Sequence, residues 1–289
     1  MSGPARARLP DGRLHLQHGP IDLVIRAWGE EAETGLAYAQ AWSRFATILE
    51  ELVAELEMLR TPVGEAYPLA RCTTARRMVA AVWPHRRVFI TPMAAVAGAV
   101  ADEVLCAMLC AARLDKAYVN NGGDIAMHVA PGRHLDAGIV NNPLQPCLDA
   151  TVRPDRPCGI ATSGWRGRSQ SRGIADAATV IATTAAQADA AATLVANAIN
   201  VQHAGVHRRP ARELKEDSDL GDLPVTVAVE ALPPAAVDAA LDSGLGAALC
   251  LARDGLLQEA YLALQGRTRA LPANRDTSQS TACRPAATS

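Results

Sequence analysis

Residues 178–200 read ATVIATTAAQADAAATLVANAIN, and they contain a strand-to-helix passage. Thr, Val and Ile over residues 178–182 predict a strand. Residues 185–200 are rich in Ala and carry larger apolar side chains at helical spacing, so they predict a helix that begins directly after the strand. The threonines between the two elements predict a polar turn where the helix opens.

The start of this predicted helix carries oxygen-bearing side chains on one face. Asp189 and Thr193 are four residues apart, so both oxygens face the same side of the helix, one turn from its start. Two such oxygens, with carbonyls from a neighbouring loop, suit a hard cation such as Mg²⁺ that is bound together with a nucleotide phosphate. The alternative interpretation is that Asp189 lies on a solvated helix face.

Three further segments place small residues beside a carboxylate or a hydroxyl. They are TPMAAVAGAVADE from Thr91, VNNGGDIA from Val119 and CGIATSGWRGR from Cys158. Small side chains let a backbone approach a ligand closely, and exposed amides and oxygens bind phosphates or metals. One such segment is common, but four in order indicate a site.

The individual segments also have simpler explanations. Two glycines inside the strand pattern of VNNGGDIA predict either close approach to a ligand or a plain Asn-Gly hairpin turn. The ATSG turn offers amides and hydroxyls, and Trp165 after it is a candidate stacking surface. Arg166 and Arg168 are candidate phosphate partners, although a structural turn is the simpler explanation of this segment.

The rest of the chain mixes helices and strands without the regular alternation of a doubly wound fold, which predicts the α+β class. Helices are predicted over residues 30–60, 74–83, 93–112 and 185–200, and strands over residues 13–28, 88–90, 116–129, 135–140, 159–162, 178–182 and 224–229. Residues 256–264 fit a strand or a helix. We expect residues 1–266 to form one α+β domain, or two intimate subdomains, and residues 267–289 to be a disordered tail.

Composition excludes several classes of protein. Of the 289 residues, 49% are hydrophobic and 20% are charged, and the formal net charge of -2 gives no electrostatic case for nucleic acid or an anionic membrane. The longest apolar stretch, residues 93–112, is interrupted by Asp102 and Glu103, which favours a buried helix over a membrane span. The first 13 residues lack the apolar core of a signal peptide, so we expect a cytoplasmic protein. Ala-rich helices are compatible with close packing in a homodimer.

Together, the four segments resemble the ApbE-like superfamily of FAD:protein FMN transferases. The segment from Thr91 is similar to that family's small-residue helix-opening motif, NNGGDI to its strand-turn GGDI, and ATSG to its ATSG turn. Residues 179–193 are similar to its strand followed by an A-D-A-x-x-T helix, and the order and spacing agree. The chain looks closer to an uncharacterised branch than to the transferases themselves. The resemblance implies an ApbE-like, T-fold-like mixed sheet with packed helices.

The resemblance also implies a metal site and a flavin-nucleotide pocket for FAD or FMN. Carried over by position, the Mg²⁺ ligands are Asp189 and Thr193, with a backbone carbonyl near Val96. The implied pocket residues are Asn121, Gly122, Gly123, Asp124, Thr162, Ser163 and Gly164. The implied chemistry is Mg²⁺-assisted attack of a protein Thr hydroxyl on the FAD pyrophosphate, with release of AMP.

Two departures from the family pattern leave alternatives open. Ala97 stands where the family carries Lys, and Arg-Gly-Ile-Ala-Asp at residues 172–176 replaces its His-Ile-Ile-Asp-Pro segment. The first hypothesis is Mg²⁺-dependent FMN transfer to a protein acceptor, or FAD hydrolysis. The second is a ligand-binding protein without turnover, and the third is a biosynthetic enzyme that uses the same cleft for a different heterocycle.

Overall fold

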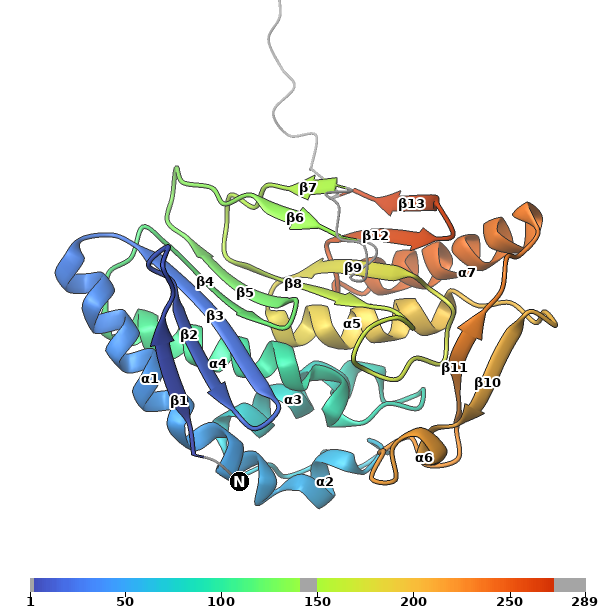
Figure 1. The fold of residues 1–289 in the computed structure, drawn as a ribbon, viewed down its shortest axis with the longest axis horizontal. Coiled ribbons are helices and arrows are strands. Elements are labelled where there is room, and N and C mark those ends of the chain that lie inside the picture. The colour runs from blue at the N-terminus through green and yellow to red at the C-terminus, as the bar shows by residue number, and fades with distance from the viewer. Residues whose placement is uncertain (1–2, 141–149, 273–289) are drawn as a thin grey trace, which may run out of the picture.

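A single long sheet organises the molecule, which the computed structural model describes over residues 3–140 and 150–272 (Figure 1). Within these residues, nine strands pair side by side, and every neighbouring pair is antiparallel. In order across the sheet they are β1 (Ala5–Arg8), β2 (Leu14–His18), β3 (Ile21–Trp28), β4 (Lys116–Asn121), β5 (Asp124–Val129), β8 (Cys158–Ser163), β9 (Ala177–Ala182), β12 (Glu259–Leu264) and β13 (Arg267–Leu271).

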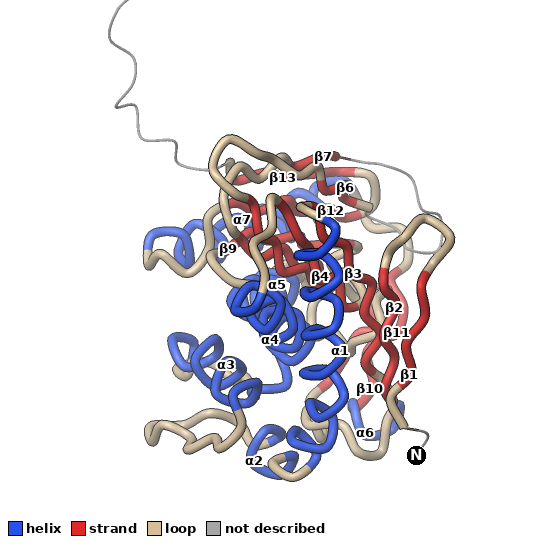
Figure 2. Tube along the Cα trace, turned by 90° about the vertical axis from the view of Figure 1, so that its left-hand side faces the viewer, coloured by secondary structure: helices blue, strands red, loops and turns tan. Residues whose placement is uncertain are grey.

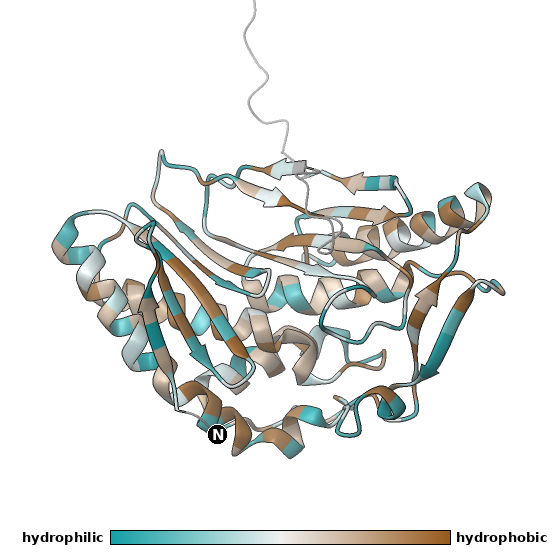
Figure 3. Ribbon diagram, viewed as in Figure 1, coloured by the Kyte–Doolittle hydropathy of each residue, from teal (hydrophilic) through white to brown (hydrophobic). Residues whose placement is uncertain are grey.

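Two excursions from this meander form small sheets of their own. The hairpin-like pair β6 (Ala137–Ile139) and β7 (Ala150–Val152) lies between β5 and β8 in the chain. The pair β10 (Val206–Pro210) and β11 (Pro224–Val229) lies between α5 and α7. Figure 3 shows that β10 and the outer strand β1 are mainly hydrophilic, whereas the central strands β3 and β9 are mainly hydrophobic.

The long helices cover one face of the sheet, as Figure 2 shows. The helices described are α1 (Glu31–Val53), α2 (Leu56–Arg60), α3 (Thr73–Val82), η1 (Trp83–His85), η2 (Pro92–Ala95), α4 (Val96–Ala111), α5 (Ala185–Ala198), α6 (Ala211–Leu214) and α7 (Pro234–Arg253). Helix α4 packs on β4 and β5, α5 on β8 and β9, and α7 on β12 and β13. Each of these three helices therefore buries its own segment of the sheet.

Side-chain alternation along the strands separates a helix-covered face from the opposite face. On β8 and β9, Ala161 and Val180 belong to the core beneath the helices. Their neighbours Ile160 and Ile181 point the other way, into a smaller cluster with Ala137 of β6. The β6–β7 pair therefore covers part of the face that the helices leave open.

Close packing of α4 against α5 depends on glycine. A Cβ atom at Gly98 on α4 would collide with the carbonyl of Ala185, and one at Gly159 on β8 would collide with the backbone of Thr184 and Ala185. The first turn of α5 is therefore held against both α4 and β8 at a distance that a larger side chain would not permit.

The predicted α+β class is confirmed, and most predicted elements are present. The hairpin at residues 13–28, the helix at residues 30–60, which becomes α1 and α2, and the strand-to-helix passage from β9 to α5 all form. Residues 256–264, for which two interpretations were open, contain the strand β12.

Two predictions are wrong. Residues 88–90 form a bend and not a strand; Val88 is exposed and contacts no neighbouring strand within the described residues. The predicted tail begins too early, because Arg267–Leu271 form strand β13 at the edge of the sheet. Arg269 on β13 pairs with Asp242 on α7 at 2.9 Å, so residues distant in sequence stabilise this edge. Residues 273–289 lie outside the described part of the chain.

Two helical segments are long and apolar enough to cross a membrane by length and composition alone. They are η2 with α4, over Pro92–Ala111, and α7, over Pro234–Arg253. In this fold both pack against the sheet, and α4 is enclosed between α1 and α5. Core packing therefore accounts for part of their apolar composition, since 50% of the window in η2 and α4 and 28% of the window in α7 is buried.

Candidate functional site

A cavity of about 660 Å³ lies where the β4–β5 turn, the end of β8, and α5 converge. A smaller cavity of about 280 Å³ continues from it toward η2 and the segment that follows α6. The two cavities share the residues Ala97, Asp124, Arg168, Ser169, Asp189 and Thr193. They therefore form one cleft in two parts.

The Gly-Gly turn of the sequence forms one wall of this cleft. Gly122 and Gly123 have φ angles of 66° and 115°, in the region that glycine tolerates, and they connect β4 to β5 in a two-residue hairpin. The Asn120 side chain closes the turn by accepting a hydrogen bond from the Gly123 amide at 2.8 Å. The hairpin interpretation and the ligand-approach interpretation are thus compatible, because both glycines line the larger cavity.

Asn121, the neighbouring residue, has a different position. Its side chain is buried and donates a hydrogen bond to the carbonyl of Ala97 at 3.1 Å, which ties β4 to the first turn of α4. It is not among the residues that line either cavity. Among the residues that form the cleft wall here, Asn120 takes the position that we expected for Asn121.

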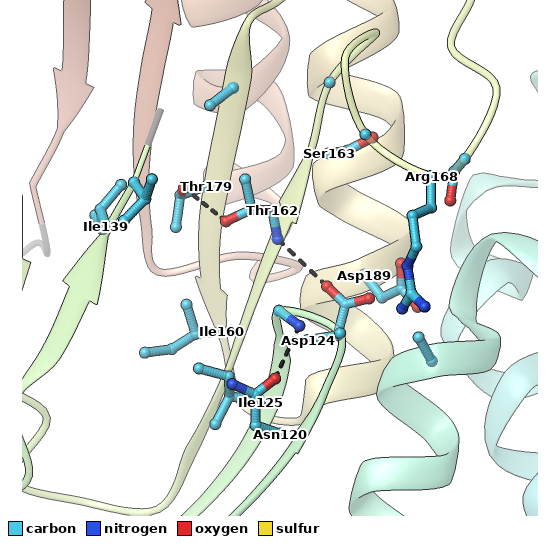
Figure 4. A pocket seen from close by; sticks show the side chains of 18 of the residues that line it. Asn120, Asp124, Ile125, Ile139, Ile160, Thr162, Ser163, Arg168, Thr179 and Asp189 are labelled. Atoms are coloured by element: carbon cyan, nitrogen blue, oxygen red, sulfur yellow. Dashed lines mark hydrogen bonds between the residues drawn. The ribbon is translucent and has the colours of Figure 1, made fainter. Parts of the chain in front are cut away.

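The ATSG turn supplies the adjoining wall, at the end of β8. Thr162, Ser163 and Gly164 all line the larger cavity. The Thr162 amide donates to the Asp124 carboxylate at 3.3 Å, and the Thr162 and Thr179 hydroxyls are 2.8 Å apart (Figure 4). We did not predict Thr179 as a site residue, because it comes to lie opposite Thr162 only when β8 and β9 pair.

The helix residues predicted to bind metal lie at the junction of the two cavities. Asp189 and Thr193 line both parts of the cleft, and Val96 lines the smaller part. Asp189 accepts a hydrogen bond from the amide of Gly98 at 3.1 Å, so its carboxylate also holds the start of α4. The structure thus brings Asp124, on the β4–β5 turn, together with Asp189, on α5.

Burial and mutual repulsion govern the charge of this carboxylate pair. Burial raises the pKa of Asp124 to about 7, although the Thr162 amide and the Arg168 charge act in the opposite direction. Burial, and then the negative charge of Asp124, raise the pKa of Asp189 well above its usual range. Two desolvated carboxylates that repel each other form a site that a divalent cation stabilises.

The donor set fits a hard cation shared with a ligand. The described residues contain no cluster of three or more His, Cys, Asp or Glu side chains of the kind that would enclose a metal by themselves. Mg²⁺ is characteristically held by one or two carboxylates with the remaining positions filled by water and substrate phosphates. Asp124 and Asp189, with the Thr193 hydroxyl nearby, match that incomplete set.

The two candidate phosphate partners have different surroundings. Arg166 pairs with Asp176 at 3.1 Å and lies over the Trp165 ring at 4.3 Å, and Trp165 itself does not line either cavity. Arg168 lines both cavities, and within the described residues it has neither a hydrogen bond nor an ion pair. Of these two arginines, therefore, Arg168 is the one that presents an unpaired cation to the cleft.

An apolar wall faces these polar groups. Ile125, Ile139 and Ile160 line the larger cavity and come from β5, β6 and β8 (Figure 4). No local motif predicts this wall, because its members meet only when β6 folds over the sheet. A cleft with an apolar wall on one side and charged groups on the other suits a ligand that has both a heterocyclic ring and phosphate.

The sequence identifies the chain that forms this fold and cleft as an ApbE-like protein. The family model described as AbpE bacteria matches residues 6–270, and the chain belongs to that family. The predicted ApbE-like relationship is thereby confirmed.

The chain is also similar to several archaeal proteins named only UPF0280 protein. It is 35% identical to the one from Methanothermobacter thermautotrophicus over 118 residues, which are 40% of this chain and 45% of that protein. For the one from Archaeoglobus fulgidus the identity is 44% over 112 residues, 38% of this chain and 45% of that protein. The chain thus spans about half the length of these relatives. The relative from Methanosphaerula palustris is 34% identical over 194 residues, 61% of this chain and 78% of that protein.

Two solved structures are similar to this one. A mutant of the flavin transferase ApbE from Vibrio cholerae superposes with a TM-score of 0.46 and 10% identity, over 94% of this chain and 98% of that chain. An ApbE protein from Thermotoga maritima gives a TM-score of 0.38 and 15% identity, over 84% and 76%. At these values, membership of the family rests on the sequence match.

Proposed function

We propose that this protein binds a flavin nucleotide together with Mg²⁺ and cleaves the pyrophosphate of FAD, either by transferring FMN to a protein hydroxyl or by hydrolysis. The observation that supports this proposal is the meeting of Asp124 and Asp189 at the junction of the cleft. Both belong to segments that resemble the family's motifs, and two partly buried carboxylates that repel each other beside a cleft are a favourable site for a cation.

The residues of the chain have separate roles in this reaction. The wall of Ile125, Ile139 and Ile160 receives the flavin ring, and the turn at Gly123, where a Cβ atom would meet nothing within 4 Å, leaves room for the phosphates. In the reaction, an acceptor oxygen forms a bond to the phosphorus of the FMN half, the bond from that phosphorus to the bridging oxygen breaks, and AMP leaves with that oxygen. The acceptor's proton is released to solvent. Bound Mg²⁺ supplies neutralisation of the phosphate charge.

A second candidate, binding of flavin without turnover, has specific support. The segment that replaces the family's His-containing motif is committed to structure: Ile174 is fully buried, and Asp176 accepts from the Gln265 amide at 2.6 Å while also pairing with Arg166. Ala97 supplies no cation to the cleft. A site that holds ligand and metal but lacks these two groups fits a carrier as well as an enzyme.

The deciding experiment is incubation of the purified protein with FAD, with and without Mg²⁺, followed by chromatographic measurement of AMP and FMN. Flavin attached to protein is measured separately by in-gel fluorescence. The proposal predicts Mg²⁺-dependent release of AMP that Asp189→Asn abolishes. Attached flavin would indicate transfer, and free FMN would indicate hydrolysis.

The matched control is Asp115→Asn, which removes an exposed carboxylate that pairs with Arg133 outside both cavities. It should leave AMP release unchanged. Binding of FAD without AMP release would favour the carrier. Absence of FAD binding in the wild-type protein would contradict both candidates and leave the alternative of a different heterocycle.

A further inference from the structure

The side chain of Arg168 reaches into the cleft beside the β4–β5 turn. Its guanidinium lies directly over Gly122, where a Cβ atom would collide with Nη2. Gly122 therefore serves the positive φ of the turn and also provides the space for Arg168. Figure 4 shows the side chain directed toward Asp124 and Asp189, and its positive charge acts on Asp124.

Two other arginines around the cleft are neutralised by acidic partners, whereas Arg168 is not. Arg60 pairs with Asp217 at 2.7 Å, and Arg166 pairs with Asp176. Within the described residues Arg168 has no such partner, so it faces the carboxylate pair without a direct contact of its own. A guanidinium that no neighbouring carboxylate neutralises is available to an anion.

We propose that Arg168 is the counter-ion of Asp124 and Asp189 when the cleft is empty, and that it contacts the phosphate of the ligand once a divalent cation has taken over the carboxylates. This inference rests on the proposed function, because it presumes a cation at the carboxylate pair and a phosphate-bearing ligand beside it. Arg168 thus selects ligands that carry a phosphate ester. In the empty protein its charge competes with a metal ion for the two carboxylates, and in the complex it binds the phosphate beside the metal ion.

The smaller cavity gives the phosphate-bearing end of the ligand a place to continue. Arg172 lines it and lies over the Phe89 ring at 6.0 Å, and within the described residues its guanidinium has no ion pair. Arg168 lies at the boundary between this part and the larger cavity. A phosphate at that boundary, with the ring against the apolar wall, accounts for both parts of the cleft.

The proposal predicts effects of opposite sign in Arg168→Ala, measured by binding alone. Mn²⁺ affinity in the absence of flavin, followed by electron paramagnetic resonance, should rise about threefold to tenfold, because a competing positive charge is lost. FMN affinity in the presence of Mg²⁺, followed by fluorescence, should fall roughly tenfold to a hundredfold, the range for loss of a charged hydrogen bond. Riboflavin, which has no phosphate, should bind with unchanged affinity.

Two further variants separate charge from shape and from folding. Arg168→Lys keeps the charge but loses the planar fork, so Mn²⁺ affinity should match the wild type while FMN affinity falls in part. Arg133→Ala removes an exposed arginine that pairs with Asp115 outside both cavities, and none of the three affinities should change.

The outcomes distinguish this inference from the function on which it rests. Equal weakening of FMN and riboflavin in Arg168→Ala, or unchanged Mn²⁺ affinity, would overturn the role of Arg168 while leaving the metal and flavin site intact. A wild-type protein that binds neither Mn²⁺ nor FMN would overturn the proposed function, and this inference with it.

Discussion

Asp102 on α4 and Asp189 on α5 are two partly buried carboxylates that have different roles at the same helix interface. Asp102 accepts hydrogen bonds from the amides of Ala185 and Ala186 at 3.0 and 2.9 Å, one on each oxygen, and so caps α5. Asp189 accepts the amide of Gly98 at 3.1 Å and so holds α4. The two helices thus bind each other's first turns through a reciprocal pair of carboxylates.

Asp102 and Asp189 differ in the surroundings of their carboxylate oxygens once these hydrogen bonds are made. Both oxygens of Asp102 are engaged, and burial raises its pKa while the amides of Ala185 and Ala186 act in the opposite direction. Asp189 lies on the cleft beside a second carboxylate, Asp124, whose charge raises its pKa further. A carboxylate that is saturated by amides is structural, whereas one left facing a like charge is ready for a cation.

The largest expected effect comes from forcing apart α4 and α5, whose close packing both carboxylates support. Gly98→Ala adds a methyl group that collides with the Ala185 carbonyl, and we expect it to lower the free energy of unfolding by about 3 kcal/mol. The control is Gly246→Ala on α7, where a Cβ atom meets nothing within 4 Å; it should stabilise by up to about 1 kcal/mol. Urea denaturation measures both, and equal stability of the two variants would contradict the close-packing account.

The second prediction compares how much Asp102 and Asp189 contribute to the free energy of unfolding. Asp102→Ala leaves two helix amides without an acceptor and should lower the free energy of unfolding by about 2 kcal/mol. Asp189→Asn keeps an acceptor for Gly98 and removes repulsion from Asp124, so its stability should stay within about 1 kcal/mol of the wild type. Thermal unfolding in metal-free buffer measures this difference. A larger loss in Asp189→Asn than in Asp102→Ala would reverse our assignment of roles.

The smallest effect concerns Glu103, the residue after Asp102. The Glu103 carboxylate forms ion pairs with Arg44 and Arg77. Burial raises its pKa, but hydrogen bonds from Thr73, Arg44 and Arg77 outweigh burial and leave the pKa below the usual value of 4.5. Because the folded-state pKa is lowered, this stabilisation is present above the unfolded-state pKa and is lost as pH falls through the folded-state value.

Stability measured at pH 7 and near pH 3 tests this sign. The wild type should lose about 1 kcal/mol more than Glu103→Gln over this interval, because the variant has no carboxylate to protonate at that position. An identical loss in both proteins would show that Glu103 carries no pH-dependent stabilisation.

The sequence predicted the local parts of the site better than its assembly. Gly122 and Gly123, the ATSG turn, and Asp189 with Thr193 are recognisable because each depends on residues close together in the chain. The apolar wall and the exchange of Asn121 for Asn120 depend on how β4, β5 and β6 pair, which no short pattern contains. The reciprocal capping of α4 and α5 is similarly a property of two segments that lie far apart in sequence.

The same reasoning explains which elements were missed. Helix α7 was not predicted, because Gly244 and Gly246 weaken its helical pattern; Gly244 is needed where Ile199 packs against the helix. Strand β13 is short and rich in charge, and Arg267 and Arg269 on it form ion pairs with Asp238 and Asp242 on α7. Such elements are stabilised by their tertiary partners and not by their own propensity.

The most direct test of the central claim is Mn²⁺ binding, followed by electron paramagnetic resonance, in the wild-type protein, Asp189→Asn and Asp102→Ala, each under conditions where it is folded. Our account predicts that Asp189→Asn loses Mn²⁺ binding and that Asp102→Ala retains it. Retention of binding in Asp189→Asn, or its loss only in Asp102→Ala, would contradict the assignment of the cation to the Asp124–Asp189 pair.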